Sequence, residues 1–321
     1  MKAIRVHEFG APEVLRLEEV PDPQPGPGQV VVQVHAAGVN PLDTLLRAGI
    51  PIGDYALDLP YTPGNDAAGV IAAVGEGVNR VAVGDRVYAQ PLSGAYAELT
   101  LCNESQVYPL PQHISYSQGS AVNIPYRTAY YALFYLAKAV PGEVVLVQGA
   151  SGTVGTAAVQ LARAAGLKVI GTAGSEKGQR FVTEQGAQHT LDYHVPDYLN
   201  QAVDLTNGHG VDVILEMVAD VNLAKDLDIL ALGGRVVVIG THGKAEIDPV
   251  SLIGRGTSIV GLNLLAIPAQ TTSSIHAALV AGLENGTLRP VIGQEMALAD
   301  APLAHRAIET SGSPGRIALI P

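Results

Sequence analysis

The sequence predicts an α/β protein in which a doubly wound parallel sheet is inserted into a mostly antiparallel β-domain. Residues 1–120 alternate short β-branched runs with Gly and Pro turns, as antiparallel strands do. From about residue 122, apolar strands alternate with helix-length segments, which is the pattern of a parallel sheet covered by helices on both faces. After residue 266, a helical stretch and the terminal strand GRIALIP are expected to complete the first domain.

The predicted domains are residues 1–121 with 267–321, and residues 122–266. The inserted domain is expected to hold six strands, enough for a complete dinucleotide-binding sheet. The sixth strand is apolar and is expected at a sheet edge, where it would pair with another subunit. In chain order these strands are VVLVQG (144–149), LKVIGTAG (167–174), HTLDY (189–193), VDVILEMV (211–218), GRVVVIG (234–240) and TSIVGLNL (257–264).

Composition narrows the class of protein. Of 321 residues, 47% are hydrophobic and only 15% are charged, so the chain can bury a large core. A formal net charge of -11 disfavours binding to nucleic-acid phosphates. The single cysteine, Cys102, excludes an internal disulfide and any multi-thiolate zinc cage. Neither a leader pattern nor a membrane-spanning run is found, so we expect a cytoplasmic protein with no membrane partner.

A glycine-rich turn follows the first strand of the inserted domain and predicts a dinucleotide site. Gly149, Gly152 and Gly155 have the spacing GxxGxxG, and a segment of helical periodicity begins directly after them. Glycine lets the backbone approach a pyrophosphate, and the helix N-terminus offers amides and a positive dipole end. A tight strand-to-helix turn without a ligand would use the same residues, but the five further strands favour the nucleotide.

The end of the second strand favours NADPH over NADH. NAD-binding proteins of this fold place an acid there to bind the ribose hydroxyls, whereas this chain has Gly174 and Ser175, followed by Lys177. The small residues leave space for a 2′-phosphate, and the lysine is a point charge that binds it. Tyr193, which ends the third strand, is expected to add a hydroxyl or to stack on the adenine. A solvated lysine and a plain edge-strand aromatic remain open alternatives.

Several long segments have the pattern of one protein family. They include HAAGVNPLDTLLRAG (35–49), LPYTPGNDAAGVIAAVGEGV (59–78), IPYRTAYYAL (124–133), VQGASGTVG (147–155) and GGRVVVIG (233–240). Over nearly its full length the chain resembles the zeta-crystallin and quinone oxidoreductase branch of the medium-chain dehydrogenase/reductase superfamily. The resemblance implies a Rossmann NADPH-binding domain inserted in a GroES-like catalytic domain. With the apolar edge strand, it favours a homodimer or homotetramer.

Zinc-bearing members of this superfamily have ligands that this chain lacks. They carry a Cys in the segment that matches AAGVN, and a His-Glu pair where this chain has Asn65 and Asp66. We therefore expect no metal and no metal-assisted alcohol oxidation. The resemblance implies NADPH-dependent reduction of quinones, by hydride or one-electron transfer, because quinones accept electrons without metal polarisation.

Two alternatives stay open. One is an enone or alkenal reductase on the same scaffold, and the other is a non-catalytic nucleotide-binding, structural or RNA-binding protein. The net charge of -11 argues against RNA as the main partner.

The resemblance also implies the residues of the site. Asn40 and Asn65 are expected to meet the substrate or the nicotinamide carboxamide, and Thr128 to face the nicotinamide, although Asn40 before Pro41 also fits a simple turn. No proton donor is assigned among Tyr55, Tyr61 and Tyr126. The remaining predicted cofactor contacts are Ser151, Gly152, Thr153 and Val154 at the pyrophosphate, Gly174, Lys177 and Tyr193 at the adenosine phosphate, Asn222 at the ribose, and Ile239, Gly240, Thr241, His242, Leu262, Asn263 and Leu264 along the nicotinamide half.

Overall fold

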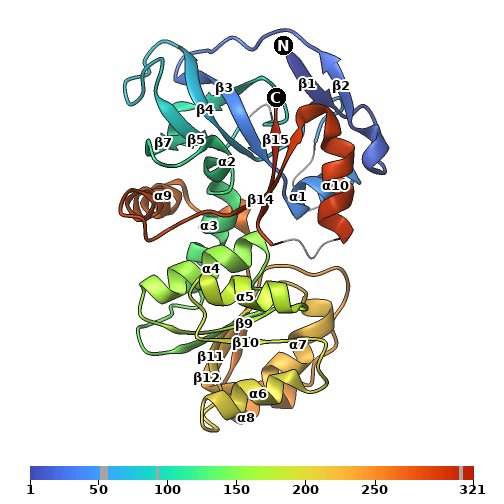
Figure 1. Ribbon diagram of the computed structural model, residues 1–321, viewed down its shortest axis with the longest axis vertical. Helices are drawn as coiled ribbons and strands as arrows, with labels where there is room; N and C mark the ends of the chain where they lie inside the picture. The colour runs from blue at the N-terminus through green and yellow to red at the C-terminus, as the bar shows by residue number, and fades with distance from the viewer. Residues whose placement is uncertain (51–56, 92–93, 311–313) are drawn as a thin grey trace. The chain divides into compact units, whose positions relative to one another are not determined.

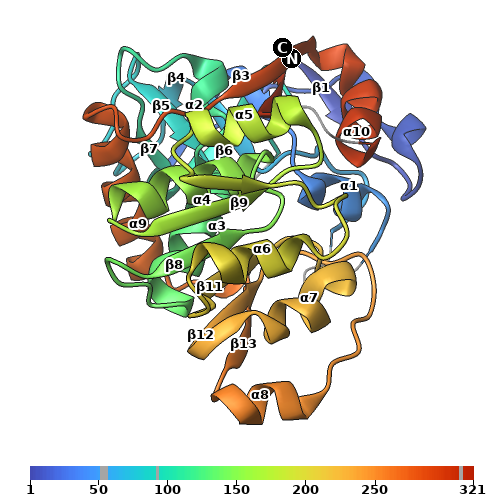
Figure 2. The same cartoon turned by 60° about the horizontal axis from the view of Figure 1, so that its bottom comes forward.

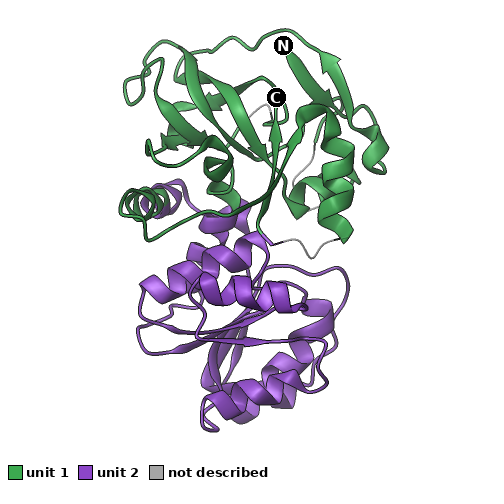
Figure 3. Cartoon of the chain, viewed as in Figure 1, with its two compact units in different colours: residues 1–124, 276–311, 315–321 green, residues 125–275, 312–314 purple. Residues whose placement is uncertain are grey.

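The computed structural model describes residues 1–50, 57–91, 94–310 and 314–321. The chain divides into two units, which Figure 3 shows in separate colours. Unit 1 comprises residues 1–124, 276–311 and 315–321, and unit 2 comprises residues 125–275 and 312–314. The chain passes from one unit to the other within helix α3 (Asn123–Tyr130) and within helix α9 (Ala269–Glu284).

Unit 1 is built on a seven-stranded sheet with the order β14-β15-β3-β4-β5-β7, in which β6 also pairs with β3. The neighbouring strands are antiparallel except for β14 and β15, which are parallel. The C-terminal strand pairs with β3, with Ala318 opposite Gly38, so the end of the chain completes the sheet of the N-terminal region (Figure 1). The strands are β3 (Gln29–Gly38), β4 (Asp66–Val74), β5 (Arg86–Ala89), β6 (Leu99–Asn103), β7 (Val107–Pro109), β14 (Ile292–Ala297) and β15 (Arg316–Ile320).

Short elements cover this sheet and enclose its core. Strands β1 (Lys2–Arg5) and β2 (Arg16–Glu19) form a separate antiparallel pair. The core is aliphatic, and its fully buried members include Ile4, Val32 and Ile71. The helices are α1 (Pro41–Arg47), α2 (Tyr116–Gly119) and α10 (Ala301–Thr310), with short 3-10 turns η1 (Pro12–Val14), η2 (Glu104–Gln106) and η5 (Leu298–Asp300).

Unit 2 contains the predicted parallel sheet, with the strand order β10-β9-β8-β11-β12-β13. All six predicted strands are confirmed, and the sixth lies at the sheet edge as expected. The prediction for the fifth strand was too short, because β12 begins at Leu230, which is buried and pairs with Val211. The strands are β8 (Val144–Val147), β9 (Lys168–Thr172), β10 (His189–Leu191), β11 (Val211–Glu216), β12 (Leu230–Val238) and β13 (Ser258–Gly261).

Helices cover both faces of the parallel sheet. Helices α4 and α5 pack on β8, β9 and β10, and the opposite face is covered by α6 and α7 (Figures 1 and 2). The order of the strands reverses between β8 and β11, where ligands bind in doubly wound sheets. The helices are α4 (Thr153–Ala164), α5 (Glu176–Glu184), α6 (Tyr198–Leu205), α7 (Ala219–Asp228) and α8 (Pro249–Arg255), with η3 (Tyr131–Leu136) and η4 (Leu264–Ala266). Within the described ranges, no helix combines the length and apolar character needed to cross a bilayer.

Candidate functional site

The glycine-rich turn joins β8 to α4 at the reversal point of the sheet. Gly149 has a φ of 62°, a left-handed conformation that glycine adopts without strain. Its N–H donates to Thr172 Oγ1 at 2.9 Å, and Ala150 N donates to Thr172 O at 2.9 Å. At Gly155 a Cβ would lie 2.5 Å from Gly149 O, so only glycine lets α4 pack this closely on the turn. The turn is therefore held by β9 on one side and by α4 on the other.

The four predicted pyrophosphate contacts lie where this helix begins. Gly152 is the N-cap residue of α4, and Thr153 and Val154 form its first turn. Ser151 and these three residues are exposed or half-buried, so a ligand can reach their backbone. The first N–H groups of a helix have no partner within the helix, and they lie at the positive end of its dipole. The geometry suits an anionic group.

The end of β9 differs from the sequence expectation in one respect. A Cβ on Gly174 would lie 2.4 Å from Tyr193 Oη and Cζ, so the tyrosine ring already occupies the room that glycine leaves. The ring is 46% exposed. Ser175 caps α5 by accepting from Gly178 N at 3.1 Å, and Lys177 lies exposed in the first turn of that helix. The structure thus brings Tyr193 beside Gly174, a contact that sequence reasoning missed.

The predicted nicotinamide residues follow the two neighbouring strands β12 and β13. Ile239 N donates to Glu216 O at 2.8 Å, and the N–H of His242 donates to Asp220 Oδ1 at 2.9 Å. Thr241 Oγ1 also donates to Asp220, at 3.2 Å. All seven predicted residues are half-buried or exposed: Ile239, Gly240, Thr241, His242, Leu262, Asn263 and Leu264.

Two further predicted contacts of unit 2 lie on helices. Asn222, on α7, is half-buried and donates through Nδ2 to Glu216 Oε1 at 3.3 Å. Thr128, on α3, is buried, with 4% of its surface exposed. Tyr126 donates through its hydroxyl to Gln160 Oε1 at 2.8 Å. Tyr55 lies outside the described residues.

Unit 1 contains a buried polar cluster around Asp66. Asp66 forms an ion pair with Arg316, and each is only 1% exposed. Asn40 lies between them, because its Oδ1 accepts from Arg316 Nη1 at 2.7 Å and its Nδ2 donates to Asp66 Oδ2 at 3.0 Å. Asn40 is 2% exposed, and its backbone N–H donates to Asp43 Oδ2 at 2.8 Å at the start of α1. The Asn40-Pro41 turn therefore begins helix α1, and the side chain of Asn40 is hydrogen-bonded within unit 1.

Asp43 connects this cluster to Asn65 and to a second buried chain of bonds. Its Oδ1 accepts from Asn65 Nδ2 at 2.7 Å, and its Oδ2 accepts from the Tyr96 hydroxyl at 3.2 Å. Burial raises the pKa of Asp43 to about 6. Tyr96 Oη lies 3.1 Å from His305 Nε2, and burial, helped by the nearby charge of Arg47, lowers the pKa of that histidine to about 3. The neutral imidazole is therefore a hydrogen-bond relay and carries no charge at neutral pH.

Sequence reasoning did not find Asp43, Tyr96, His305 or Arg316 as members of this cluster. Arg316 bonds to a residue 276 positions away, and no local pattern signals such a contact. Of the residues in this cluster, the sequence analysis had singled out Asn40 and Asn65 as site residues.

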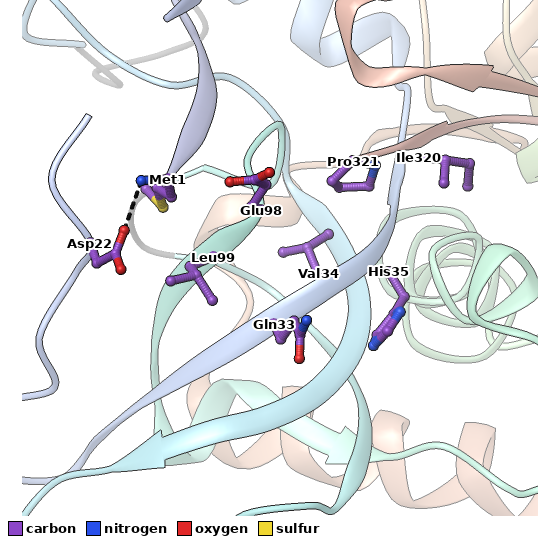
Figure 4. Close-up of a pocket in the computed structure, with 9 residues that line it drawn as sticks. All are labelled: Met1, Asp22, Gln33, Val34, His35, Glu98, Leu99, Ile320 and Pro321. Carbon is purple, nitrogen blue, oxygen red and sulfur yellow. Dashed lines mark hydrogen bonds and ion pairs between the residues drawn. The ribbon is translucent and has the colours of Figure 1, made fainter. Parts of the chain in front are cut away.

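A surface cavity of unit 1 is separate from the predicted residues. It has a volume of about 540 Å³, and Figure 4 shows the Met1 amino group bonded to Asp22 at its rim. None of its lining residues was predicted to belong to the site. They are Met1, Asp22, Gln33, Val34, His35, Glu98, Leu99, Ile320 and Pro321.

Two family models match the chain. Residues 26–112 match the alcohol dehydrogenase GroES-like domain, and residues 153–279 match the zinc-binding dehydrogenase model. A quinone oxidoreductase of Rattus norvegicus is 46% identical over 323 residues, covering 100% of this chain and 98% of the relative. The chain belongs to the quinone oxidoreductase family. This family lies within the medium-chain dehydrogenase/reductase superfamily, as the resemblance implied.

Solved structures of this superfamily share the fold across the whole chain. The quinone oxidoreductase of Escherichia coli complexed with NADPH has a TM-score of 0.91 at 28% identity, with 100% of both chains covered. A structure described as an NAD-dependent alcohol dehydrogenase has a TM-score of 0.94 at 30% identity, again with 100% of both chains covered. Since proteins with different cofactors share this fold, cofactor choice must depend on local residues.

The residues of this quinone oxidoreductase family member do not fit a zinc ion. Asn40 and Asn65 present carboxamides, whereas zinc is bound by thiolates, imidazoles and carboxylates. The neighbouring carboxylate of Asp66 is paired with Arg316 and accepts from Ile124 N at 2.9 Å. In the parts of the chain that the structure describes, no three His, Cys, Asp or Glu side chains are grouped around a common point.

Replacing Arg316 tests how far unit 1 depends on the Asp66 cluster. Arg316→Met leaves Asp66 as a buried charge without its partner, which should cost about 3–5 kcal/mol of unfolding free energy. Adding Asp66→Asn to this variant should recover part of the loss. Chemical denaturation measures the change.

The matched control is Arg306→Met, which removes an ion pair with Glu13 whose side chains are 46% and 59% exposed. It should leave the denaturation midpoint unchanged. Equal effects of the two arginine substitutions would show that the buried pair has no special part in stability.

Proposed function

We propose that this protein is an NADPH-dependent, zinc-independent quinone oxidoreductase. The observation that supports this most directly is the accessible start of α4 after the glycine turn, at the reversal point of the parallel sheet. The full-length match to a quinone oxidoreductase at 46% identity, and the fold shared with an NADPH complex, agree with it.

The chain's own groups bind and orient the dinucleotide in this proposal. The backbone at Ser151, Gly152, Thr153 and Val154 receives the pyrophosphate, because it lies at the positive end of α4, where the first N–H groups of the helix have no partner within the helix. The N–H of Gly152 itself donates to Gly149 O at 3.1 Å and closes the turn. Asn222 binds the ribose, and the residues after β12 and β13 lie along the nicotinamide half, with Thr128 facing the ring. The bound NADPH supplies the hydride or electron, so the protein's task is positioning and charge stabilisation.

Preference for the 2′-phosphate rests on the end of β9. No carboxylate lies between Thr172 and Ser175, and the first acid after them, Glu176, is paired with Arg180 at 2.6 Å. This pairing reduces the repulsion that Glu176 would exert on a phosphate. Lys177 and the Tyr193 hydroxyl are the groups that we expect to bind it.

Asn65 and Asn40 take different parts in the proposal. Asn65 is half-buried and is held by Asp43, so it is the better placed of the two to meet the substrate or the carboxamide. Asn40 is almost fully buried, and its polar atoms bond to Arg316, Asp66 and Asp43. We therefore expect Asn40 to be a positioning residue.

The substrate class is tested by acceptor-dependent NADPH oxidation. We expect 9,10-phenanthrenequinone to be reduced at least about tenfold faster than a panel of alkenals at equal concentration, because the carboxamides of Asn40 and Asn65 do not suit a zinc ion that would polarise an alkenal carbonyl. Loss of NADPH absorbance measures both rates. Faster turnover of alkenals would favour an enone or alkenal reductase, and NADPH binding without turnover of either class would contradict the enzyme assignment.

Lys177→Ala tests the assignment of the phosphate site. The variant should raise the Kd of NADPH about tenfold or more, while the Kd of NADH changes little, because only NADPH has the 2′-phosphate. Fluorescence titration measures both constants. Lys168→Ala is the control, since Lys168 is exposed at the opposite end of β9 and should leave both constants unchanged. Equal losses for the two cofactors would show that Lys177 does not bind this phosphate.

We also propose that the β13 edge pairs with a second copy of the chain. Among the described residues, β13 has one neighbour in the sheet, β12. The adjacent helix α8 exposes Val250 by 66% and Ile253 by 79%. An unpaired apolar strand at a sheet edge promotes aggregation unless another strand pairs with it. Light scattering should show a homodimer or homotetramer, and a strictly monomeric protein would contradict the proposal. The cytoplasmic location expected from the sequence stays a prediction.

A further inference from the structure

A chain of buried hydrogen bonds runs beneath the glycine turn. Thr172 Oγ1, which accepts from Gly149 N, donates to Gln148 Oε1 at 3.1 Å. Gln148 Nε2 in turn donates to Asp226 Oδ1 at 2.9 Å. Gln148, Thr172 and Asp226 are each at most 2% exposed. The backbone of the turn is thus connected to a carboxyl group on α7.

A second carboxyl group meets the first. Glu216, at the end of β11, is fully buried. Asn222, whose side chain donates to Glu216, and Asp226 are one turn apart on α7, so Glu216 and Asp226 lie close together. Glu216 Oε1 accepts from Val218 N and from Asn222 Nδ2. Glu216 is therefore bonded to Asn222, the residue proposed to bind the ribose.

The geometry places a proton between the two acids. Glu216 Oε2 and Asp226 Oδ2 are both buried, and no donor in the described part of the chain reaches either oxygen. Two carboxylates cannot donate to each other, so a hydrogen bond between them requires that one be protonated. None of the ion pairs between described residues includes either acid, so no cation offsets a second negative charge here.

The neighbouring groups fix which oxygens share this proton. Gln148 Oε1 accepts from both Thr172 and the Tyr198 hydroxyl, the latter at 3.2 Å. The amide nitrogen of Gln148 must therefore face Asp226 Oδ1, which leaves Oδ2 as the free oxygen of this carboxyl group. Burial raises the pKa of Tyr198 to about 12, so this hydroxyl keeps its proton across the range in which the acids titrate.

We propose that Glu216 and Asp226 share one proton and act as a positioning pair for the cofactor site. The pair holds the turn at Gly149 through Gln148 and Thr172, and it holds Asn222 and the backbone at Val218 through Glu216. This inference rests on the proposed cofactor site, and it assigns to it two residues that do not touch the ligand.

The sign of the pH dependence follows from the shared proton. Burial, and then the hydrogen bond to Glu216, raise the pKa of Asp226 from 3.8 to about 9. The folded protein thus keeps a proton that the unfolded chain releases near pH 4. Raising the pH from about 4 to about 9 therefore lowers the free energy of unfolding. Above about pH 9 two adjacent carboxylates repel each other without a cation between them. We expect the turn and Asn222 to lose their fixed positions.

Cofactor titration over pH is the first test. Between pH 7 and about pH 10, the Kd of both NADPH and NADH should rise about tenfold. A tenfold change corresponds to a coupling of one pKa unit between the shared proton and cofactor binding. NADH lacks the 2′-phosphate, so a loss shared by both cofactors does not come from Lys177. A Kd of NADH that stays constant over this range would overturn the proposal.

Two substitutions of Asp226 separate positioning from packing. Asp226→Leu keeps the branched shape of the side chain but removes its proton and its acceptors, and should weaken the binding of both cofactors at pH 7. Asp226→Asn supplies a fixed N–H toward Glu216 and an oxygen toward Gln148, so it should restore most of the affinity and remove the loss above pH 9. Asp228→Asn, at an exposed carboxylate of the same helix, is the control and should keep the wild-type pH profile. A wild-type pH profile for Asp226→Asn would contradict the shared proton.

Infrared spectroscopy tests the proton without any cofactor. The wild type at pH 7 should show the carbonyl stretch of a protonated carboxyl group, and Asp226→Asn should lack it. If that stretch is absent from the wild type, the shared proton is wrong even where NADPH binds. If the stretch is present and NADPH does not bind at pH 7, the pair stands and the proposed cofactor site fails.

Discussion

The candidate cofactor site in unit 2 depends on the close contact between α4 and the turn that precedes it. A Cβ at Gly155 would lie 2.6 Å from Ala150 Cα, so the helix can lie against the turn only because this residue is glycine. The helix start then presents its free amides at the reversal point of the sheet. Thr172 and Gln148 connect the same turn to Asp226. In our proposal, cofactor affinity therefore depends on groups that the cofactor does not touch.

Unit 1 depends on a different constraint, the buried ion pair of Asp66 and Arg316. Such a pair adds little net stability, because both charges lose their hydration. Removing one partner is nevertheless strongly destabilising, because it leaves the other charge buried without compensation. Its effect is to join the C-terminal strand to β4 and to Asn40 at the start of α1. Asp43 accepts from Asn40 and from Asn65, so it connects Asn65 to the pair through Asn40. One polar cluster therefore sets the positions of both asparagines that the sequence singled out.

The sequence predicted what depends on local periodicity and turn chemistry. The six parallel strands, the edge position of β13 and the glycine turn all follow from patterns of a few residues. Contacts between distant segments were missed, because nothing local signals that Tyr193 covers Gly174 or that Glu216 meets Asp226. The Tyr193 ring lies where the sequence predicted space beside Gly174, and the role of both residues at the adenosine phosphate stays a prediction. The roles of the predicted site residues in binding and catalysis stay predictions.

A crystal structure of the protein with NADPH tests the central claim most directly. We predict the pyrophosphate at the backbone of residues 151–154, the 2′-phosphate beside Lys177 and Tyr193, and the ribose within reach of Asn222. A pyrophosphate bound away from the start of α4, or a 2′-phosphate directed away from Lys177, would contradict this account.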